Sequence, residues 1–397
     1  MGAVVKPRSQ TVILMLAFVA FISLGLPDGL LSIAGPDIRE SFRVGLDRFG
    51  LVFVTGTIGY FLSSIASGWL TGRLGVGRLL ALSCACTAAA LLGYTLAPGW
   101  WAVVLLGLLS GAGAGAIDAG LNNYIAANHS DGLMQWLHAS FGVGTTIGPL
   151  IMTTVLAQEL SWRWGYIIVG GAQLALATCF FLTAEMWQGN PQAPKAEQLQ
   201  YKTPVGQTLR IPAAWMSIAI FFLYTGLEAG TGAWAYSLFT QERGIAEETA
   251  GLWVAIYWGV FTIGRITAGI ITGRIGITLL LRLSMIGALL ATMLFTWNPF
   301  PASGAVALAI LGFSLAPIFP GLVSTTAARV GVEHASNTIG FQIGIASVGM
   351  GILTALVGVM ANAFSDGIGL EVLGPFQVVV AALILILHEL THRHTRR

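Results

Sequence analysis

Charged side chains are scarce in this sequence: 19 Lys and Arg and 17 Asp and Glu make up 9% of its 397 residues. Soluble domains typically carry about 25% charged residues. So few charges cannot cover the surface of one or two soluble domains. The composition therefore excludes a water-soluble enzyme, a nucleic-acid-binding protein and a disordered chain. The formal net charge of +2 gives no indication of an acidic partner.

Cysteine is also rare, with three residues that all lie in apolar runs. Cys84 and Cys86 are two residues apart, so on a helix they point to different sides. This spacing makes neither a zinc pair nor a disulfide framework. We expect these residues and Cys179 to pack as small side chains, and we expect no metal and no cofactor.

Motifs for nucleotide binding and zinc catalysis are missing or incomplete. The glycine run at 111–115 follows no predicted strand, and no Walker A lysine motif occurs, so ATP-driven transport has no support. Residues 388–392 (HELTH) fit the H-E-x-x-H zinc motif, but no third ligand follows His392. A basic tail explains these residues equally well, which leaves an intramembrane zinc protease as a remote alternative.

Long apolar runs fill most of the chain. A bilayer core about 30 Å thick needs about 20 apolar residues per helix, and these runs lack the short alternation of a membrane β-barrel. We predict an all-α polytopic membrane protein with twelve transmembrane helices. The predicted spans are residues 11–34, 49–71, 79–97, 101–127, 137–157, 165–186, 212–240, 249–272, 279–297, 302–328, 337–362 and 371–390.

One polar stretch, residues 187–211, separates the sixth span from the seventh. It contains three prolines and is too short for a domain, so we predict a cytoplasmic linker. The predicted domains on either side are six-helix bundles at residues 1–186 and 212–397. Of the 19 Lys and Arg, 13 fall on the side that holds both termini and five on the other, which predicts that both termini are cytoplasmic.

An internal repeat relates the two predicted bundles. A shift of 201 residues aligns residues 68–75 (GWLTGRLG) with residues 269–276 (GIITGRIG), and it also aligns Gly111 with Gly312. We therefore predict two pseudo-symmetric halves. Such a plan places a substrate site near the membrane midplane between the halves.

These features resemble the major facilitator superfamily over essentially the whole chain. The resemblance is carried by the two sets of six spans, by the Gly-x-x-x-Gly-Arg-x-Gly-x-x-Arg loop at 68–78, and by its echo after the eighth span. Gly72 departs from the pattern, since the superfamily usually has an acid there. Narrower motifs resemble the branch that holds the fucose permease and the bacterial glucose/mannose–proton symporters. They are residues 25–29 (GLPDG), 115–122 (GAIDAGLN), 224–228 (YTGLE) and 316–320 (APIFP).

Four charged residues lie well inside predicted spans, away from the span ends: Asp28, Asp118, Glu228 and Arg265. A charge at a helix centre costs about 2.5–3.5 kcal/mol on insertion scales, so each is a functional candidate. Carboxylates in apolar surroundings exchange protons near neutral pH, as a proton-coupled carrier requires. Each acid could also be purely structural, and Arg265 could either reach toward Glu228 or extend to the membrane surface.

The resemblance implies substrate binding and proton coupling for Asp28 and Asp118, and sugar contact for Glu228. Aromatic faces pack on the C–H groups of sugars, and amides bind sugar hydroxyls. On this chemistry the further predicted substrate-binding residues are Asn122, Asn123, Trp234, Tyr236, Tyr257, Trp258, Asn337 and Gln342. Asn122 lies one turn after Asp118, on the same helix face.

We therefore predict a secondary active transporter of the cell membrane, not an enzyme. It carries a small polar solute, with a monosaccharide as first candidate, inward with a proton by alternating access. A proton-coupled exporter of hydrophobic compounds is the alternative, and the coupling ion stays open between proton and sodium. The predicted partners are the solute, the ion and the lipid bilayer, with no nucleic acid, and we expect a monomer.

Overall fold

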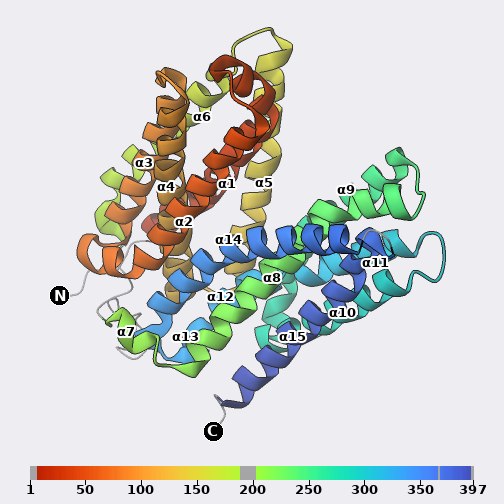
Figure 1. Ribbon diagram of the computed structural model, residues 1–397. Helices are drawn as coiled ribbons and strands as arrows, with labels where there is room; N and C mark the ends of the chain where they lie inside the picture. Colours follow the sequence, from red (N-terminus) through yellow and green to blue (C-terminus); the bar gives the residue numbers. More distant parts are fainter. Residues whose placement is uncertain (1–6, 188–202, 365–366, 395–397) are drawn as a thin grey trace. The chain divides into compact units, whose positions relative to one another are not determined.

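The computed structural model describes residues 7–187, 203–364 and 367–394 (Figure 1). Within these residues twelve helical segments are long and apolar enough to cross a membrane, and no strand occurs. The predicted all-α fold with twelve spans is therefore confirmed.

The long helices follow the predicted order. The first six are α1 (Pro7–Phe42), α2 (Leu46–Leu74), α3 (Val76–Leu96), α4 (Trp100–Asn128), α5 (Asp131–Ala157) and α6 (Arg163–Leu182), followed by a short turn, η1 (Ala184–Trp187). After the short helix α7 (Val205–Thr208) come α8 (Pro212–Ser237), η2 (Leu238–Glu242), α9 (Glu247–Ile275), α10 (Ile277–Trp297), α11 (Ser303–Leu315), α12 (Ile318–Ser324), α13 (Thr326–Val330), α14 (Val332–Ala363), η3 (Gly369–Val372) and α15 (Leu373–His394).

The chain divides into two compact units. The first comprises residues 1–128, 137–203 and 339–344, and the second comprises residues 129–136, 204–338 and 345–397. The bundle limits at 186 and 212 remain predictions. The predicted linker at 187–211 falls mostly on residues 188–202, which lie outside the described residues.

The tenth span differs from its prediction. The apolar pattern predicts one helix over 302–328, but the structure has three pieces, α11, α12 and α13. Pro317 lies at the first break, where its missing N–H and its ring prevent a continuous helix. The fifth helix also begins earlier than predicted, at Asp131, so His138 lies two turns inside α5 and not at its start.

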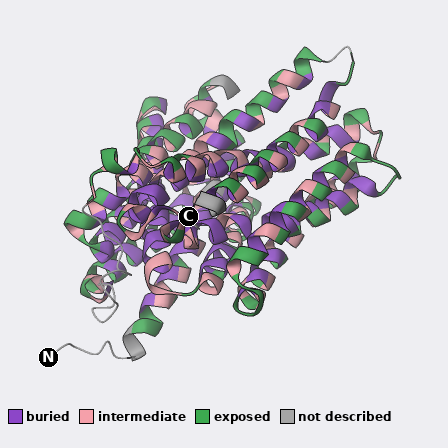
Figure 2. Cartoon of the chain, turned by 90° about the horizontal axis from the view of Figure 1, so that it is seen from below, coloured by how far each residue is buried: buried purple, intermediate pink, exposed green. Residues whose placement is uncertain are grey.

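Apolar side chains cover the exposed faces of the helices. Met15, Leu62 and Leu105 are 65%, 58% and 69% exposed, and buried and exposed residues alternate around most helices (Figure 2). Contiguous apolar surface of this kind is rare on soluble monomers and suits contact with lipid. The structure thus supports a multi-pass membrane protein.

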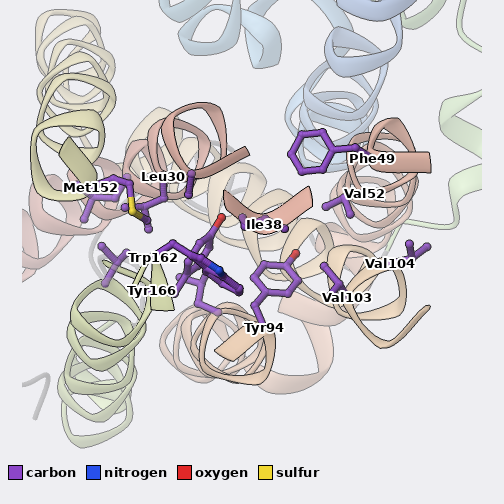
Figure 3. Close-up of a cluster of buried hydrophobic side chains, with 14 of the residues drawn as sticks. Leu30, Ile38, Phe49, Val52, Tyr94, Val103, Val104, Met152, Trp162 and Tyr166 are labelled. Atoms are coloured by element: carbon purple, nitrogen blue, oxygen red, sulfur yellow. The ribbon is translucent and has the colours of Figure 1, made fainter. Parts of the chain in front are cut away.

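A buried aromatic core holds one end of the first unit. The rings of Tyr94 and Trp162 both pack edge-on against Tyr166, at centroid distances of 5.5 Å (Figure 3). The indole N–H of Trp162 donates to the hydroxyl of Ser41 at 3.0 Å, which ties α6 to α1. Trp100, the first residue of α4, belongs to the same core. Asp118 lies 18 residues further along α4, or about 27 Å along the helix axis, well away from this apolar end.

The 201-residue repeat also appears in the backbone. Gly75, between α2 and α3, has φ 78° and ψ 158°, and Gly276, between α9 and α10, has φ 77° and ψ 148°. In both turns the glycine N–H donates at 2.9 Å to the carbonyl of a threonine, Thr71 or Thr272. This backbone region is essentially restricted to glycine. The two halves therefore use the same tight turn at equivalent positions.

A second structural equivalence was not evident from the sequence. In the first unit, Gln173 of α6 donates to the carbonyl of Ser23 in α1 at 3.0 Å. In the second unit, Gln377 of α15 donates to the hydroxyl of Thr231 in α8 at 2.8 Å. In each half a buried glutamine therefore fastens the sixth long helix to the first.

Replacing Gly75 or Gly276 with alanine should lower the free energy of unfolding by about 1–3 kcal/mol, because alanine is strained in this backbone region. An added Cβ meets nothing within 4 Å at either position, so backbone strain is the only cost. The melting temperature of the detergent-purified protein measures the effect. Gly171→Ala is the matched control, since Gly171 lies inside α6 with open space at its Cβ and alanine favours the helix. Equal melting temperatures for all three variants would contradict the prediction.

Candidate functional site

Glycines of α4 bring helix α2 close to Asp118. A Cβ at Gly111 would collide with the carbonyl oxygen of Gly56, and a Cβ at Gly115 would collide with that of Tyr60. Small residues allow helix backbones to approach in this way. The close approach sets the side chain of Tyr60 beside Asp118, which lies less than one turn after Gly115.

Four side chains of the first unit then form a continuous hydrogen-bonded chain. The hydroxyl of Tyr60 donates to Oδ2 of Asp118. Nδ2 of Asn122 donates to Oδ1 of Asp118 at 2.6 Å and to its backbone carbonyl at 3.0 Å. Nε2 of His138 lies 2.9 Å from Oδ1 of Asn122, and the imidazole packs edge-on against the ring of Phe21. We call these four residues, Tyr60, Asp118, Asn122 and His138, the acid cluster.

The acid cluster is largely shielded from solvent. Asp118 is 8% exposed, His138 6% and Asn122 0%, whereas Tyr60 is half-buried. Because the amide nitrogen of Asn122 faces Asp118, its oxygen faces the imidazole, and Nε2 of His138 must carry a hydrogen. The predicted proximity of Asp118 and Asn122 is thus observed, with His138 added to it.

A second polar cluster lies in the second unit, on α8 and α9. The hydroxyl of Tyr257 donates to the backbone carbonyl of Glu228 at 3.0 Å. The carboxyl of Glu228 interacts with the hydroxyl of Tyr224 and, electrostatically, with Arg265. Arg265 is 8% exposed, and its guanidinium carbon lies 4.3 Å above the ring of Phe261. We call these residues, Tyr224, Glu228, Tyr257 and Arg265, the ion-pair cluster.

The break in the tenth span contributes to this cluster. Helix α11 ends at Leu315, just before Pro317, so the Leu315 carbonyl has no partner in a continuing helix. The hydroxyl of Tyr224 donates to that carbonyl at 3.0 Å. The proline break thus supplies an acceptor that fixes Tyr224 next to Glu228.

The other predicted site residues have varied environments. Asp28 lies in α1, but its side chain is outside the described part of the structure. Asn123 and Gln342 are both 0% exposed. Neither polar side-chain atom of Asn123 has a hydrogen-bond partner among the described residues.

The predicted aromatic and amide ligands of the second unit only partly converge. Trp258 is 40% exposed and packs against Tyr257 at a centroid distance of 4.8 Å. The indole N–H of Trp234 donates to the carbonyl of Thr354 at 2.9 Å, and Tyr236 is 39% exposed. Nδ2 of Asn337 donates at 3.0 Å to Thr208 of α7, which gives this side chain a role in holding a short helix.

Three residues of the clusters, Tyr60, His138 and Tyr224, were not predicted as site residues. Nothing in the sequence distinguishes Tyr60 from other aromatic residues in apolar spans. The glycine run at 111–115 is the one signal that another helix packs closely against α4. Tyr224 lies four residues before Glu228, and this helical spacing was a usable signal.

The zinc motif does not form a metal site in the described residues. Nε and Nη2 of Arg282 donate to the two carboxylate oxygens of Glu389 at 2.6 and 2.8 Å. No group of three or more His, Cys, Asp or Glu in the described part of the chain is placed to hold a metal ion. The side chain of His392 is outside that part.

Comparison with known proteins identifies the family. The sequence model of the Major Facilitator Superfamily matches residues 13–355. The chain is similar to sodium-dependent glucose transporter 1 of Homo sapiens, with 23% identity covering 87% of this chain and 73% of that protein. It is also similar to the glucose/mannose transporter GlcP of Bacillus subtilis, with 22% identity covering 82% of each.

Solved structures share the fold. The E. coli fucose:proton symporter FucP has a TM-score of 0.74 at 16% identity, covering 97% of this chain and 99% of that one. A bacterial homologue of the iron transporter ferroportin has a TM-score of 0.76 at 12% identity, covering 96% and 99%. Such different cargoes on one fold mean that the likeness establishes architecture and not the solute. The resemblance predicted from the sequence motifs is confirmed by the family match: this chain belongs to the Major Facilitator Superfamily, a family of transporters.

Proposed function

We propose that this protein imports a neutral monosaccharide together with a proton, by alternating access. The observation that carries the proposal is Asp118, a carboxylate buried within α4 whose two oxygens each accept a hydrogen bond. Acids inside membrane spans mark proton relays or substrate paths by default. The donors Tyr60 and Asn122 are neutral, so protonation of the carboxyl leaves neither of them as an unpaired charge.

The same geometry favours a proton over sodium as the coupling ion. Hard cations bind directly to several oxygen atoms. A sodium ion at Oδ1 of Asp118 would lie beside the N–H group of Asn122, which repels a cation and is held in place by the contact of this amide with His138. A proton needs no set of oxygen ligands, because it adds to one oxygen that already takes part in hydrogen bonding.

The ion-pair cluster supports a neutral polar solute. Glu228 and Arg265 balance each other's charge, and the ring of Trp258 beside Tyr257 offers an apolar face. Hydroxyl groups of a sugar can bond to charged side chains without adding net charge. Relatives named for glucose and mannose agree with this class. Another relative, of Bacillus subtilis, is named hexuronate transporter and is 23% identical over 81% of this chain. An anionic sugar such as glucuronate is therefore the substrate to compare with the neutral sugars.

The remaining parts of the proposal follow from the sequence. Asp28 acts with Asp118 in coupling, both termini are cytoplasmic, and the chain functions as a monomer in the cell membrane. Export of hydrophobic compounds is the competing function. Resistance of overexpressing cells to hydrophobic toxic compounds, without sugar uptake, would favour that function instead.

Uptake into proteoliposomes tests the proposal. The purified protein is reconstituted and given an inward proton gradient, and labelled glucose, mannose, fucose, xylose or glucuronate is added. We expect at least one neutral sugar to accumulate, and a protonophore to abolish the accumulation even in sodium-free medium. Failure of every neutral sugar, or accumulation driven only by a sodium gradient, would overturn the proposal.

Asp118→Asn should abolish accumulation, so that the internal sugar concentration stops at the external one, because the amide cannot take up a proton. Sugar counterflow in the absence of a gradient should persist. Glu185→Gln is the matched control, since Glu185 is an exposed residue of the turn η1. This variant should accumulate sugar like the wild type. Undiminished accumulation by Asp118→Asn would show that this acid does not carry the coupled proton.

Glu228→Gln should weaken binding of the neutral sugar about 10-fold or more, since hydrogen bonds to charged groups contribute about 1.5–3 kcal/mol. It removes the negative charge that interacts with Arg265, so affinity for glucuronate should rise. Isothermal titration of the purified protein measures both affinities. Glu247→Gln, on the exposed first turn of α9, is the control and should change neither. Parallel losses for both sugars would argue for a purely structural Glu228.

A further inference from the structure

We infer that Tyr60 is the group through which Asp118 exchanges its proton, and that the proton binds at Oδ2 of the carboxyl. The inference rests on the proposed function for its role in transport, but its chemistry concerns the acid cluster alone. No sequence motif indicates Tyr60. Its position follows from the close approach of α2 to α4, which glycines 111 and 115 permit.

The two oxygens of Asp118 have different kinds of donor. Oδ1 receives an N–H of Asn122, and an amide nitrogen can only donate. Oδ2 receives the hydroxyl of Tyr60, and a hydroxyl can donate or accept. The amide N–H offers no acceptor to a proton on Oδ1, whereas a proton on Oδ2 can point at the phenol oxygen when the phenol hydrogen points elsewhere.

The amide of Asn122 is not free to adapt. Turning it over would place its oxygen against Oδ1 of the Asp118 carboxylate and its NH₂ group against the N–H of His138. The oxygen–oxygen contact is repulsive while the carboxyl is charged, and the contact with His138 would require the imidazole to change its tautomer. In its present orientation Nδ2 donates to Asp118 twice and Oδ1 faces Nε2 of His138 at 2.9 Å. Asn122 and His138 therefore act together as a clamp on Oδ1, which leaves Oδ2 as the oxygen that changes.

Exposure points to the same route. Of the four residues of the acid cluster, Tyr60 alone is half-buried, while the others are at most 8% exposed. The phenol is therefore the member of the acid cluster that is most readily reached from outside the cluster. The step is balanced without a charged tyrosine: a hydronium ion gives a proton to the phenol oxygen and leaves as water, while the phenol hydrogen passes to Oδ2. The carboxylate becomes a neutral acid, and the phenol changes from donor to acceptor.

Titratable groups lie on several helices around the acid cluster. Helix α2 brings Tyr60 and helix α5 brings His138 to the cluster. Helix α4 itself carries Tyr124, helix α3 carries Cys84, Cys86 and Tyr94, and α1 carries Asp28. The phenol of Tyr60 touches the carboxyl of Asp118 directly.

Infrared pH titration of the purified protein in detergent tests the inference without any sugar. The carboxylic C=O band that is missing from Asp118→Asn reports protonation of Asp118. In the wild type a tyrosine C–O band should change in the same pH step, because the phenol reverses its hydrogen bond. If no tyrosine band changes with the carboxyl band, the inference is wrong, and this measurement needs no variant that might fail to fold.

Tyr60→Phe removes a hydrogen bond from both forms of the carboxyl, and the bond to the charged form is the stronger one, so protonation should occur at a pH about one unit higher than in the wild type. The tyrosine band should disappear from that step. Tyr94→Phe is the matched control, since Tyr94 is a buried tyrosine of the aromatic core, and it should titrate like the wild type. The inference would be overturned if the carboxyl of Tyr60→Phe took up its proton at the same pH as the wild type. It would also be overturned if Tyr94→Phe showed an equal shift.

The outcomes separate this inference from the proposed function. If no sugar is transported but the titration shifts as expected, the proposed function fails and the role of Tyr60 stands. If uptake is proton-coupled but Tyr60→Phe changes neither the titration nor the pH midpoint of uptake, the role of Tyr60 fails alone.

Discussion

A carboxylate inside a membrane span is costly unless hydrogen-bond donors reach it, and this constraint organises the first unit. The cost at a helix centre is about 2.5–3.5 kcal/mol on insertion scales. Here α4 supplies one donor from Asn122, a turn away from Asp118, and α2 supplies the other from Tyr60. The second donor exists only because glycines let the two backbones approach. The glycines of α4 thus allow α4 to carry a buried carboxylate, because they let α2 bring a hydrogen-bond donor to Asp118.

The repeated architecture holds two chemically different sites. Both halves use the same glycine turn, at Gly75 and Gly276, and in both a buried glutamine fastens the sixth long helix to the first. The buried carboxyl groups of the two halves, in contrast, have different partners. In the first unit a carboxyl is held by neutral donors, whereas in the second a carboxyl interacts with Arg265. Such a division suits a carrier in which one half titrates and the other recognises a neutral solute.

Much of the fold could be predicted because apolar run length depends on bilayer thickness alone. The contact between Asp118 and Asn122 was also predictable, since it depends only on helical spacing. Contacts between helices were not. Tyr60 reaches Asp118 through a packing geometry that a single sequence does not specify, and the break at Pro317 interrupts a run that hydropathy describes as continuous. Asn337 stays a predicted sugar ligand, and the contact of its amide with Thr208 of α7 is another that the sequence did not indicate.

The most direct test of the central claim is a simultaneous recording of sugar entry and internal pH in proteoliposomes without any imposed ion gradient. Sugar flowing down its own gradient should draw protons with it, so the lumen should acidify in step with sugar entry in sodium-free medium. Sugar entry with a constant internal pH would contradict proton coupling through the buried carboxyl.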